Sequence, residues 1–154
     1  MTYMLTRIAE KDLEEIYELG SCMHGESLFE PLDYDRDSVM RFLRQYVDSP
    51  DINFGLVGRK DGVLCGFFTG YVSPYFFGRD RIATEVLWYV AQEHRGSRLG
   101  LRMLKGFEDW ARACGASEVC VGISTGVSYE RTGALLQRLG YIHAGGIYKL
   151  PVVG

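Results

Sequence analysis

A short loop between an apolar strand and a long helix carries the residues most suited to chemistry. Residues 90–101 read VAQEHRGSRLGL, with Arg95, Gly96, Arg98 and Gly100 placed where the helical pattern begins. The first N–H groups of a helix have no partner within it, and the helix dipole makes that end positive. Glycines let the backbone approach an anion closely, and arginines add charge-assisted hydrogen bonds to phosphate oxygens. The pattern therefore predicts a site for a phosphate-bearing ligand, and a surface turn with solvated arginines is the alternative.

Hydrophobic periodicity predicts the elements that position this loop. Strands are expected over residues 2–9, 52–59, 63–72, 82–91 and 118–124, and a final hairpin over residues 141–144 and 147–150 around Gly145-Gly146. Helices are expected over about residues 13–20, 37–47, 97–114 and 128–139.

The predicted order of elements is β-α-α-β-β-β-α-β-α-β-β, in which an antiparallel first half leads into a strand–helix–strand crossover. This order predicts an α/β (α+β) fold, with a mixed central sheet of about six to seven strands flanked by about four helices. The length of 154 residues suits one domain, residues 1–154, because a second domain would leave each half with a marginal core.

Two motifs and the order of elements resemble the GCN5-related N-acetyltransferase (GNAT) superfamily over nearly the whole chain. The acetyl-CoA motif of that family, Gln/Arg-x-x-Gly-x-Gly/Ala, is similar to residues 95–100, RGSRLG. The family's helix-four ending, commonly Leu-Tyr-x-x-x-Gly-Phe, is similar to residues 135–141, LLQRLGY. The resemblance implies the GNAT fold and transfer of an acetyl group from acetyl-CoA, as co-substrate, to a primary amine by direct attack in a ternary complex.

The resemblance also implies where acetyl-CoA binds. Backbone groups of the fourth strand would hold the pantetheine arm, the diphosphate would lie on the loop and the helix start, and an opening between the fourth and fifth strands would admit the arm. The expected cofactor-binding residues are Trp88, Tyr89, Val90, Ala91, Arg95, Gly96, Ser97, Arg98, Leu99 and Gly100.

The sequence departs from the family's pattern at two positions. Arg98 replaces the inner glycine of the loop, which is acceptable if the backbone there needs no positive φ. Leu136 stands where the family often has a tyrosine that acts as general acid toward the leaving thiolate. Tyr129 is the replacement that we carry forward as a catalytic candidate. Tyr141 and Tyr148 are further replacements, and all three also fit ordinary packed aromatics.

A primary amine with a pKa near 10.4 is mostly protonated at neutral pH, so a base must remove a proton before attack. Family members often use a carboxylate on the fourth strand, and Glu85 lies there. Strict alternation places Glu85 on the face opposite to Val86 and Trp88, and a bulge over residues 88–90 would reverse that register. Glu26 is the second candidate, in the segment between the first two helices that walls the acceptor site in the family.

Composition limits the partners of the chain. With 17 basic and 20 acidic residues the net charge is −3, so a nucleic-acid partner is not expected. There is no apolar run long enough to span a membrane and no signal-peptide pattern, and a cytoplasmic location with reduced thiols is expected. The scattered cysteines and histidines predict no metal site.

The resemblance implies acetyl-CoA and an amine acceptor, either a small molecule or a protein, as the partners. A homodimer is also compatible with the sequence, because the aromatic loop over residues 73–81 and the C-terminal hairpin offer apolar surface to a second copy.

Two other functions are weighed against the transferase. A non-catalytic acyl-CoA-binding or protein-interaction module on the same fold is the main alternative, because fold does not determine function. A Rossmann-like nucleotide-binding unit is disfavoured, because its Gly-x-Gly-x-x-Gly pattern follows the first strand and the loop described above follows several strands.

Overall fold

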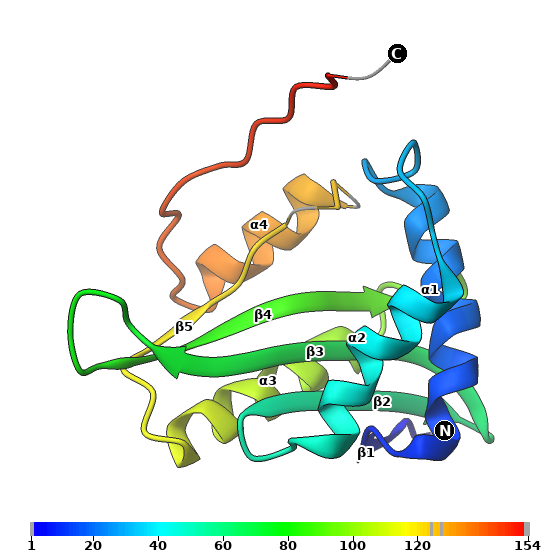
Figure 1. The fold of residues 1–154 in the computed structure, drawn as a ribbon, viewed down its shortest axis with the longest axis horizontal. Helices are drawn as coiled ribbons and strands as arrows, with labels where there is room; N and C mark the ends of the chain where they lie inside the picture. Colours follow the sequence, from blue (N-terminus) through cyan, green and yellow to red (C-terminus); the bar gives the residue numbers. More distant parts are fainter. Residues whose placement is uncertain (1, 124, 127, 153–154) are drawn as a thin grey trace.

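The computed structural model describes residues 2–123, 125–126 and 128–152 (Figure 1). The strands of this described part are β1 (Met4–Arg7), β2 (Asn53–Lys60), β3 (Val63–Pro74), β4 (Arg81–Val90) and β5 (Glu118–Cys120). Its α-helices are α1 (Leu13–Glu26), α2 (Arg36–Asp48), α3 (Leu99–Ala113) and α4 (Tyr129–Arg138), with short 3₁₀ helices η1 (Glu10–Asp12) and η2 (Gln92–His94).

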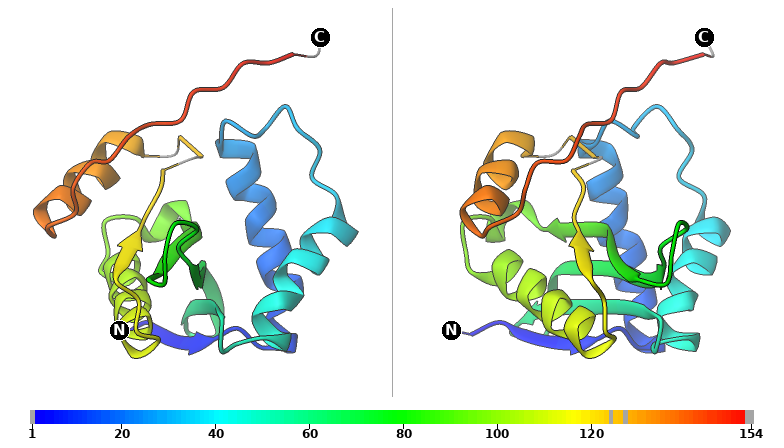
Figure 2. Two further views of the ribbon diagram at one scale, coloured as in Figure 1. Left: turned by 60° about the vertical axis from the view of Figure 1, so that its left-hand side comes forward. Right: turned by 90° about the vertical axis from the view of Figure 1, so that its left-hand side faces the viewer.

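The strands form one sheet in the order β1-β2-β3-β4-β5. The first four are antiparallel neighbours, and β5 lies parallel to β4 after the crossover through α3. Helices α1 and α2 cover one face of the sheet, while α3 and α4 lie on the other side (Figure 2). The predicted mixed sheet flanked by four helices is therefore confirmed.

Both faces of the sheet are buried, and adjacent residues of β3 illustrate how. Phe67 packs in the cluster under α1 and α2, whereas Phe68 packs in the cluster under α3. Successive side chains of a strand point to opposite faces, so each phenylalanine serves a different core. The two-sided burial explains why β2 and β3 read as nearly continuous apolar runs.

Several boundaries differ from the prediction. Helix α1 continues to Glu26 instead of ending near residue 20, and Met23 extends its buried face. Helix α3 begins at Leu99 because the Ser97 hydroxyl accepts the Leu99 N–H, at 3.3 Å, before the helix starts. Strand β5 ends at Cys120, and residue 124, its predicted end, lies outside the described residues.

The predicted final hairpin is wrong for the described residues. Residues 141–152 form neither helix nor strand, so the described sheet has five strands instead of six to seven. An isolated two-stranded hairpin is marginal in water unless a third strand or a helix supports it. In Figures 1 and 2 this segment runs past α4 and away from β5, the strand that would have provided that support.

None of the described helices combines the length and the apolar character required to cross a bilayer.

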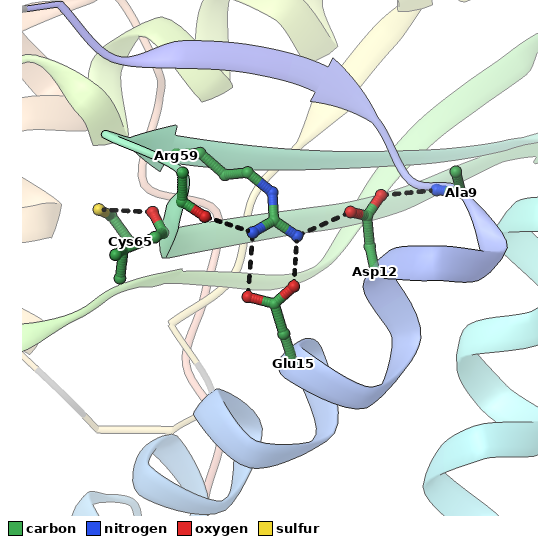
Figure 3. A network of polar contacts seen from close by, with 7 residues as sticks. Ala9, Asp12, Glu15, Arg59 and Cys65 are labelled. Atoms are coloured by element: carbon green, nitrogen blue, oxygen red, sulfur yellow. Dashed lines mark hydrogen bonds and ion pairs between the residues drawn. The ribbon is translucent and has the colours of Figure 1, made fainter.

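A buried ion-pair network fixes the start of α1 against β2 (Figure 3). Asp12 is only 1% exposed, and one of its carboxylate oxygens accepts a hydrogen bond from Arg59 at 2.8 Å. Its other oxygen accepts the backbone N–H of Ala9 at 2.9 Å. Arg59 also pairs with Glu15 at 2.8 Å, which anchors the next turn of the helix. These contacts tie the helix that carries Glu26 to the sheet.

We expect Asp12→Ala to lower the free energy of unfolding by about 2–3 kcal/mol, because it leaves the Arg59 guanidinium and the Ala9 N–H without their buried partner. Urea denaturation measures the change. The control is Glu14→Ala in α1, which breaks the exposed ion pair with Arg36 of α2 and leaves stability unchanged. Equal losses in both variants would mean that the buried network does not anchor α1.

Candidate active site between strands β4 and β5

The site begins where β4 and β5 separate. Their backbone pairing runs from Ile82 to Thr84 and then stops. At the same level β4 contains a bulge, because Leu87 pairs with Thr69 of β3 and Glu85 pairs with Gly70, which leaves Val86 as an extra residue. A bulge bends a strand and redirects the side chains that follow. The reversal of register considered for residues 88–90 therefore occurs at Val86.

A cavity of about 350 Å³ occupies the space between the separated strands. Its walls are formed by β4, by the loop leading to α3, by the first turn of α3, by residues after β5 and by one face of α4. The predicted cofactor-binding residues that line it are Trp88, Tyr89, Val90, Arg95, Gly96, Ser97, Arg98 and Gly100. Ala91 and Leu99 are instead buried in the core, at 7% and 0% exposure.

The backbone at one end of the cavity is shaped to receive an anion. Gly96 has φ +85°, a conformation that favours glycine, whereas Arg98 has φ −83° and accommodates a side chain without strain. The first N–H of α3 that bonds back within the helix belongs to Arg102, so those of Gly100 and Leu101 have no partner in the helix. No acidic residue lies in the first turn of α3, which leaves this end positive.

Two further arginines, which the sequence pattern had not indicated, line the same cavity. Arg131 and Arg138 of α4 both line the cavity, together with Arg95 and Arg98. A Cβ built on Gly96 would lie 3.5 Å from an Arg131 guanidinium nitrogen, which places that side chain directly over the loop. The signal was present in the sequence, because residues 131, 135 and 138 are spaced to share one helical face.

Glu85 is the only carboxylate among the described residues that line the cavity. Its carboxylate accepts the backbone N–H of Gly122 at 3.0 Å, so it bridges the two strands just beyond the last pair of their ladder. Burial raises the pKa of Glu85 to about 7, although the hydrogen bond from Gly122 opposes the shift. A carboxyl group with this pKa exchanges a proton readily near neutral pH.

Glu26 does not line the cavity but is connected to it through two residues that do. At the end of α1 it pairs with Arg95 at 3.0 Å and accepts a hydrogen bond from the Tyr89 hydroxyl. Arg95 also donates to the carbonyl oxygen of Val90 at 3.0 Å. The hydrogen bond from Arg95 lowers the pKa of Glu26, which keeps the carboxylate charged. This network clamps the end of α1 to the loop that follows β4.

The candidate tyrosines lie away from the described cavity lining. Tyr129, in the first turn of α4, is 51% exposed and does not line the cavity. Tyr141 donates its hydroxyl to Glu108 at 2.7 Å, and Tyr148 is 97% exposed. Leu136, at the family's tyrosine position, packs in the core under α3.

A second cavity, of about 410 Å³, lies on the other face of the sheet between α1 and α2. Its walls are mostly apolar and include Phe42, Phe67 and Met23, while Asp33 lies at its polar side. Leu87, the residue that follows the bulge, lines both cavities. The two spaces therefore approach each other at the bulge in β4.

Comparison with known proteins adds a family to this geometry. Residues 13–141 match the model of the acetyltransferase (GNAT) family. No curated protein matches the sequence significantly.

Solved structures share the fold at low sequence identity. The aminoglycoside acetyltransferase HMB0005 from an uncultured soil metagenomic sample has a TM-score of 0.76 at 19% identity, covering 99% of this chain and 100% of that chain. AAC(6')-Iy, in complex with the bisubstrate analog CoA-S-monomethyl-acetylneamine, has a TM-score of 0.77 at 14% identity over both complete chains. A predicted acetyltransferase with acetyl-CoA from Clostridium acetobutylicum has a TM-score of 0.78 at 10% identity, covering 98% of this chain and 97% of that chain.

The raised pKa of Glu85 predicts a pH-dependent stability that Glu85→Gln removes. A carboxyl group that titrates near 4.5 when unfolded and near 7 when folded stabilises the fold in its protonated form. That stabilisation is complete below pH 4.5 and is lost as the pH rises to about 7. We therefore expect the stability of Glu85→Gln, relative to the unsubstituted chain, to increase between these values in urea denaturation. Glu118→Gln, at an exposed position on β5, is the control, and a pH profile shared by both variants would contradict the assignment.

Proposed function

The chain belongs to the acetyltransferase (GNAT) family, and from that premise we propose that residues 1–154 act as one N-acetyltransferase domain. The domain moves the acetyl group of acetyl-CoA to a primary amine by direct attack in a ternary complex. One observation carries the proposal: a single cavity joins an arginine-rich helix start to a carboxyl group whose pKa of about 7 suits a general base.

Acetyl-CoA is the co-substrate, and the cavity offers each part of it suitable groups. We propose that the diphosphate lies at the start of α3, where Gly100 and Leu101 provide free N–H groups and Arg98 and Arg131 provide positive charge. The pantetheine arm then follows Trp88 to Val90 on β4, a stretch that no longer pairs with β5. The acetyl end thereby points toward the bulge and Glu85.

The proposed reaction is a nucleophilic acyl substitution. Glu85 accepts a proton from the ammonium form of the acceptor, and the neutral amine attacks the thioester carbonyl. A C–N bond forms and the C–S bond breaks. The newly acylated nitrogen gives up its second proton to water, and the thiolate of CoA leaves and is protonated from Glu85. A carboxyl group with a pKa near 7 is a stronger base than an ordinary glutamate. Its pKa is still below the value of about 10.4 of the amine, and this difference is compatible with proton transfer as the amine attacks.

We propose that Glu26 is a positioning residue and not the base. Its lowered pKa makes it a weak proton acceptor, and both of its carboxylate oxygens are engaged with Arg95 and Tyr89. By holding Arg95 it orients the loop that receives the diphosphate. The exposed position of Tyr129, outside the cavity, gives no support to a role as general acid.

The acceptor is proposed to bind from the side of the second cavity, which shares the lining residue Leu87 with the first. Its apolar walls favour an amine with an apolar body, and the Asp33 carboxylate on its polar side favours a cationic one. A small aryl-alkyl amine or an apolar peptide N-terminus fits this description better than a polyamine does.

A non-catalytic acyl-CoA-binding module is the second candidate, favoured by Leu136 in place of the family's tyrosine. Release of the CoA thiol, measured with acetyl-CoA and a panel of aryl-alkyl amines, polyamines, amino acids and peptides, separates the two. The transferase releases thiol with at least one amine. Tight binding of CoA without thiol release for any amine would favour the module.

Gly100→Trp is expected to weaken CoA binding by at least tenfold in isothermal titration calorimetry, because the indole fills the space beside Trp88 and Val90 where a Cβ would have only ordinary contacts at 3.6 Å. Arg112→Trp, which adds the same side chain at an exposed position of α3, is the control and retains the affinity. Unchanged affinity in Gly100→Trp would place the cofactor elsewhere.

Glu85→Gln is expected to lower kcat by roughly 10²–10⁴ with little change in the KM for acetyl-CoA, because the base is lost and the diphosphate site is intact. The limb of the kcat/KM profile near pH 7 should disappear with it. Glu118→Gln again provides the control. A profile that keeps its limb near pH 7 in Glu85→Gln would assign proton removal to another group.

A further inference from the structure

Leu87 on β4 is the one residue of the described chain that lines both cavities. It directly follows the bulge at Val86 and lies two residues after Glu85, at the end of the first cavity where the acetyl group is proposed to lie. Its side chain packs with Phe67 and Tyr89 in the cluster under α1 and α2. Leu87 therefore lies at the boundary between the first cavity and the second.

The sheet itself does not close this boundary. The pairing of β4 with β5 ends at Thr84 and Cys120, before the chain reaches Leu87. Beyond that point the chain after β5 rises away from β4 toward α4 (Figure 1). A paired ladder separates the two faces of a sheet with continuous backbone, and at the level of Leu87 β4 has no such ladder on its β5 side. Side chains therefore form the partition there.

The backbone that carries Leu87 is held in place. Its N–H donates to the hydroxyl oxygen of Thr69 at 3.2 Å, and Thr69, its partner across the ladder to β3, is fully buried. Phe67, on the same face of β3, is also buried. Because the strand is fixed on both sides of this contact, the size of the Leu87 side chain, and not movement of β4, determines how wide the passage between the cavities is.

The second cavity has the size and the walls to hold an alkyl chain. Its volume of about 410 Å³ lies in the range of ligand pockets, roughly 300–1,000 Å³. Ile16, Leu43 and Phe67 contribute buried apolar surface to its walls. Each methylene group transferred from water into such surroundings tightens binding about fourfold.

We propose that Leu87 is a specificity-determining residue that restricts the acyl donor to acetyl-CoA and other short thioesters. The inference rests on the proposed function, because it requires the acyl group to lie at the bulge. A longer acyl chain, extending from the thioester past Val86, meets the Leu87 side chain before it reaches the second cavity. The same side chain keeps the second cavity available to the amine acceptor while the donor is bound.

Isothermal titration calorimetry with acetyl-CoA, butanoyl-CoA and hexanoyl-CoA tests the restriction without an acceptor. We expect hexanoyl-CoA to bind the unsubstituted chain about tenfold more weakly than acetyl-CoA, because its chain has to displace packed side chains. In Leu87→Ala it should bind at least as tightly as acetyl-CoA. Leu135→Ala is the control, because it removes the same atoms from a half-buried residue that lines the first cavity alone, and it keeps the original preference.

Two further substitutions at the same position give a graded test that does not depend on Leu87→Ala folding. Leu87→Val shortens the side chain and suits a strand, and it should recover part of the affinity for hexanoyl-CoA. Leu87→Phe enlarges the side chain and should weaken butanoyl-CoA more than acetyl-CoA. An affinity for the longer donors that does not follow the size of residue 87 would contradict the partition.

A double variant tests where the longer chain goes. Val39 of α2 lines the second cavity alone and is half-buried, so Val39→Trp fills that space. Added to Leu87→Ala, it should remove the gain for hexanoyl-CoA and leave the affinity for acetyl-CoA unchanged. A gain that persists in the double variant would show that the chain does not enter the second cavity, and would overturn the inference.

The outcomes also separate this inference from the function on which it rests. Equal binding of acetyl-CoA and hexanoyl-CoA to the unsubstituted chain, or the same preference in Leu87→Ala and Leu135→Ala, would overturn the role of Leu87 and leave the coenzyme site intact. Failure of CoA and acetyl-CoA to bind the unsubstituted chain would overturn the proposed function and the inference with it.

Discussion

The separation of β4 from β5 after Thr84 is the constraint on which the rest of the candidate site depends. The bulge at Val86 ends the parallel ladder and directs Leu87 toward the face covered by α1 and α2. Backbone groups of β4 that a longer ladder would have used are thus available to an extended ligand arm. A strand pair that stayed closed would leave no space for the cavity, and Glu85 would have no cleft to face.

The cavity has a positively charged part at the start of α3 and a part near the bulge where the carboxyl group of Glu85 is buried. At the loop and the start of α3, the helix end together with Arg98 and Arg131 attracts an anion. At the bulge, burial dominates, and the pKa of Glu85 rises to about 7 even though positive charge lines the same cavity. The network of Glu26, Tyr89 and Arg95 ties the loop to the end of α1, whose own start is fixed by Asp12 and Arg59. The positive groups that favour an anion and the carboxyl group of Glu85 therefore line one cavity, and the pKa of Glu85 stays raised.

The sequence predicted the elements near the loop well, because local rules govern them. Gly96 needs a positive φ, Arg98 does not, and the periodicity of α3 reveals its buried face. The bulge at Val86 was not located, because the register of β4 is set by its pairing with β3, a contact between distant residues. Arg131 was missed for a similar reason: its spacing on α4 was visible, but the approach of α4 to Gly96 is a tertiary contact. The hairpin predicted over residues 141–144 and 147–150 is absent, because strand propensity alone does not provide a neighbouring strand to pair with.

A crystal structure of the CoA complex tests whether the coenzyme lies between β4 and β5 with its reactive end at Glu85. We expect the diphosphate at the start of α3 beside Arg98 and Arg131, and the CoA sulfur at the bulge, facing the Glu85 carboxylate. A diphosphate bound away from α3, or a CoA sulfur separated from Glu85 by intact packing of β4 against β5, would contradict it.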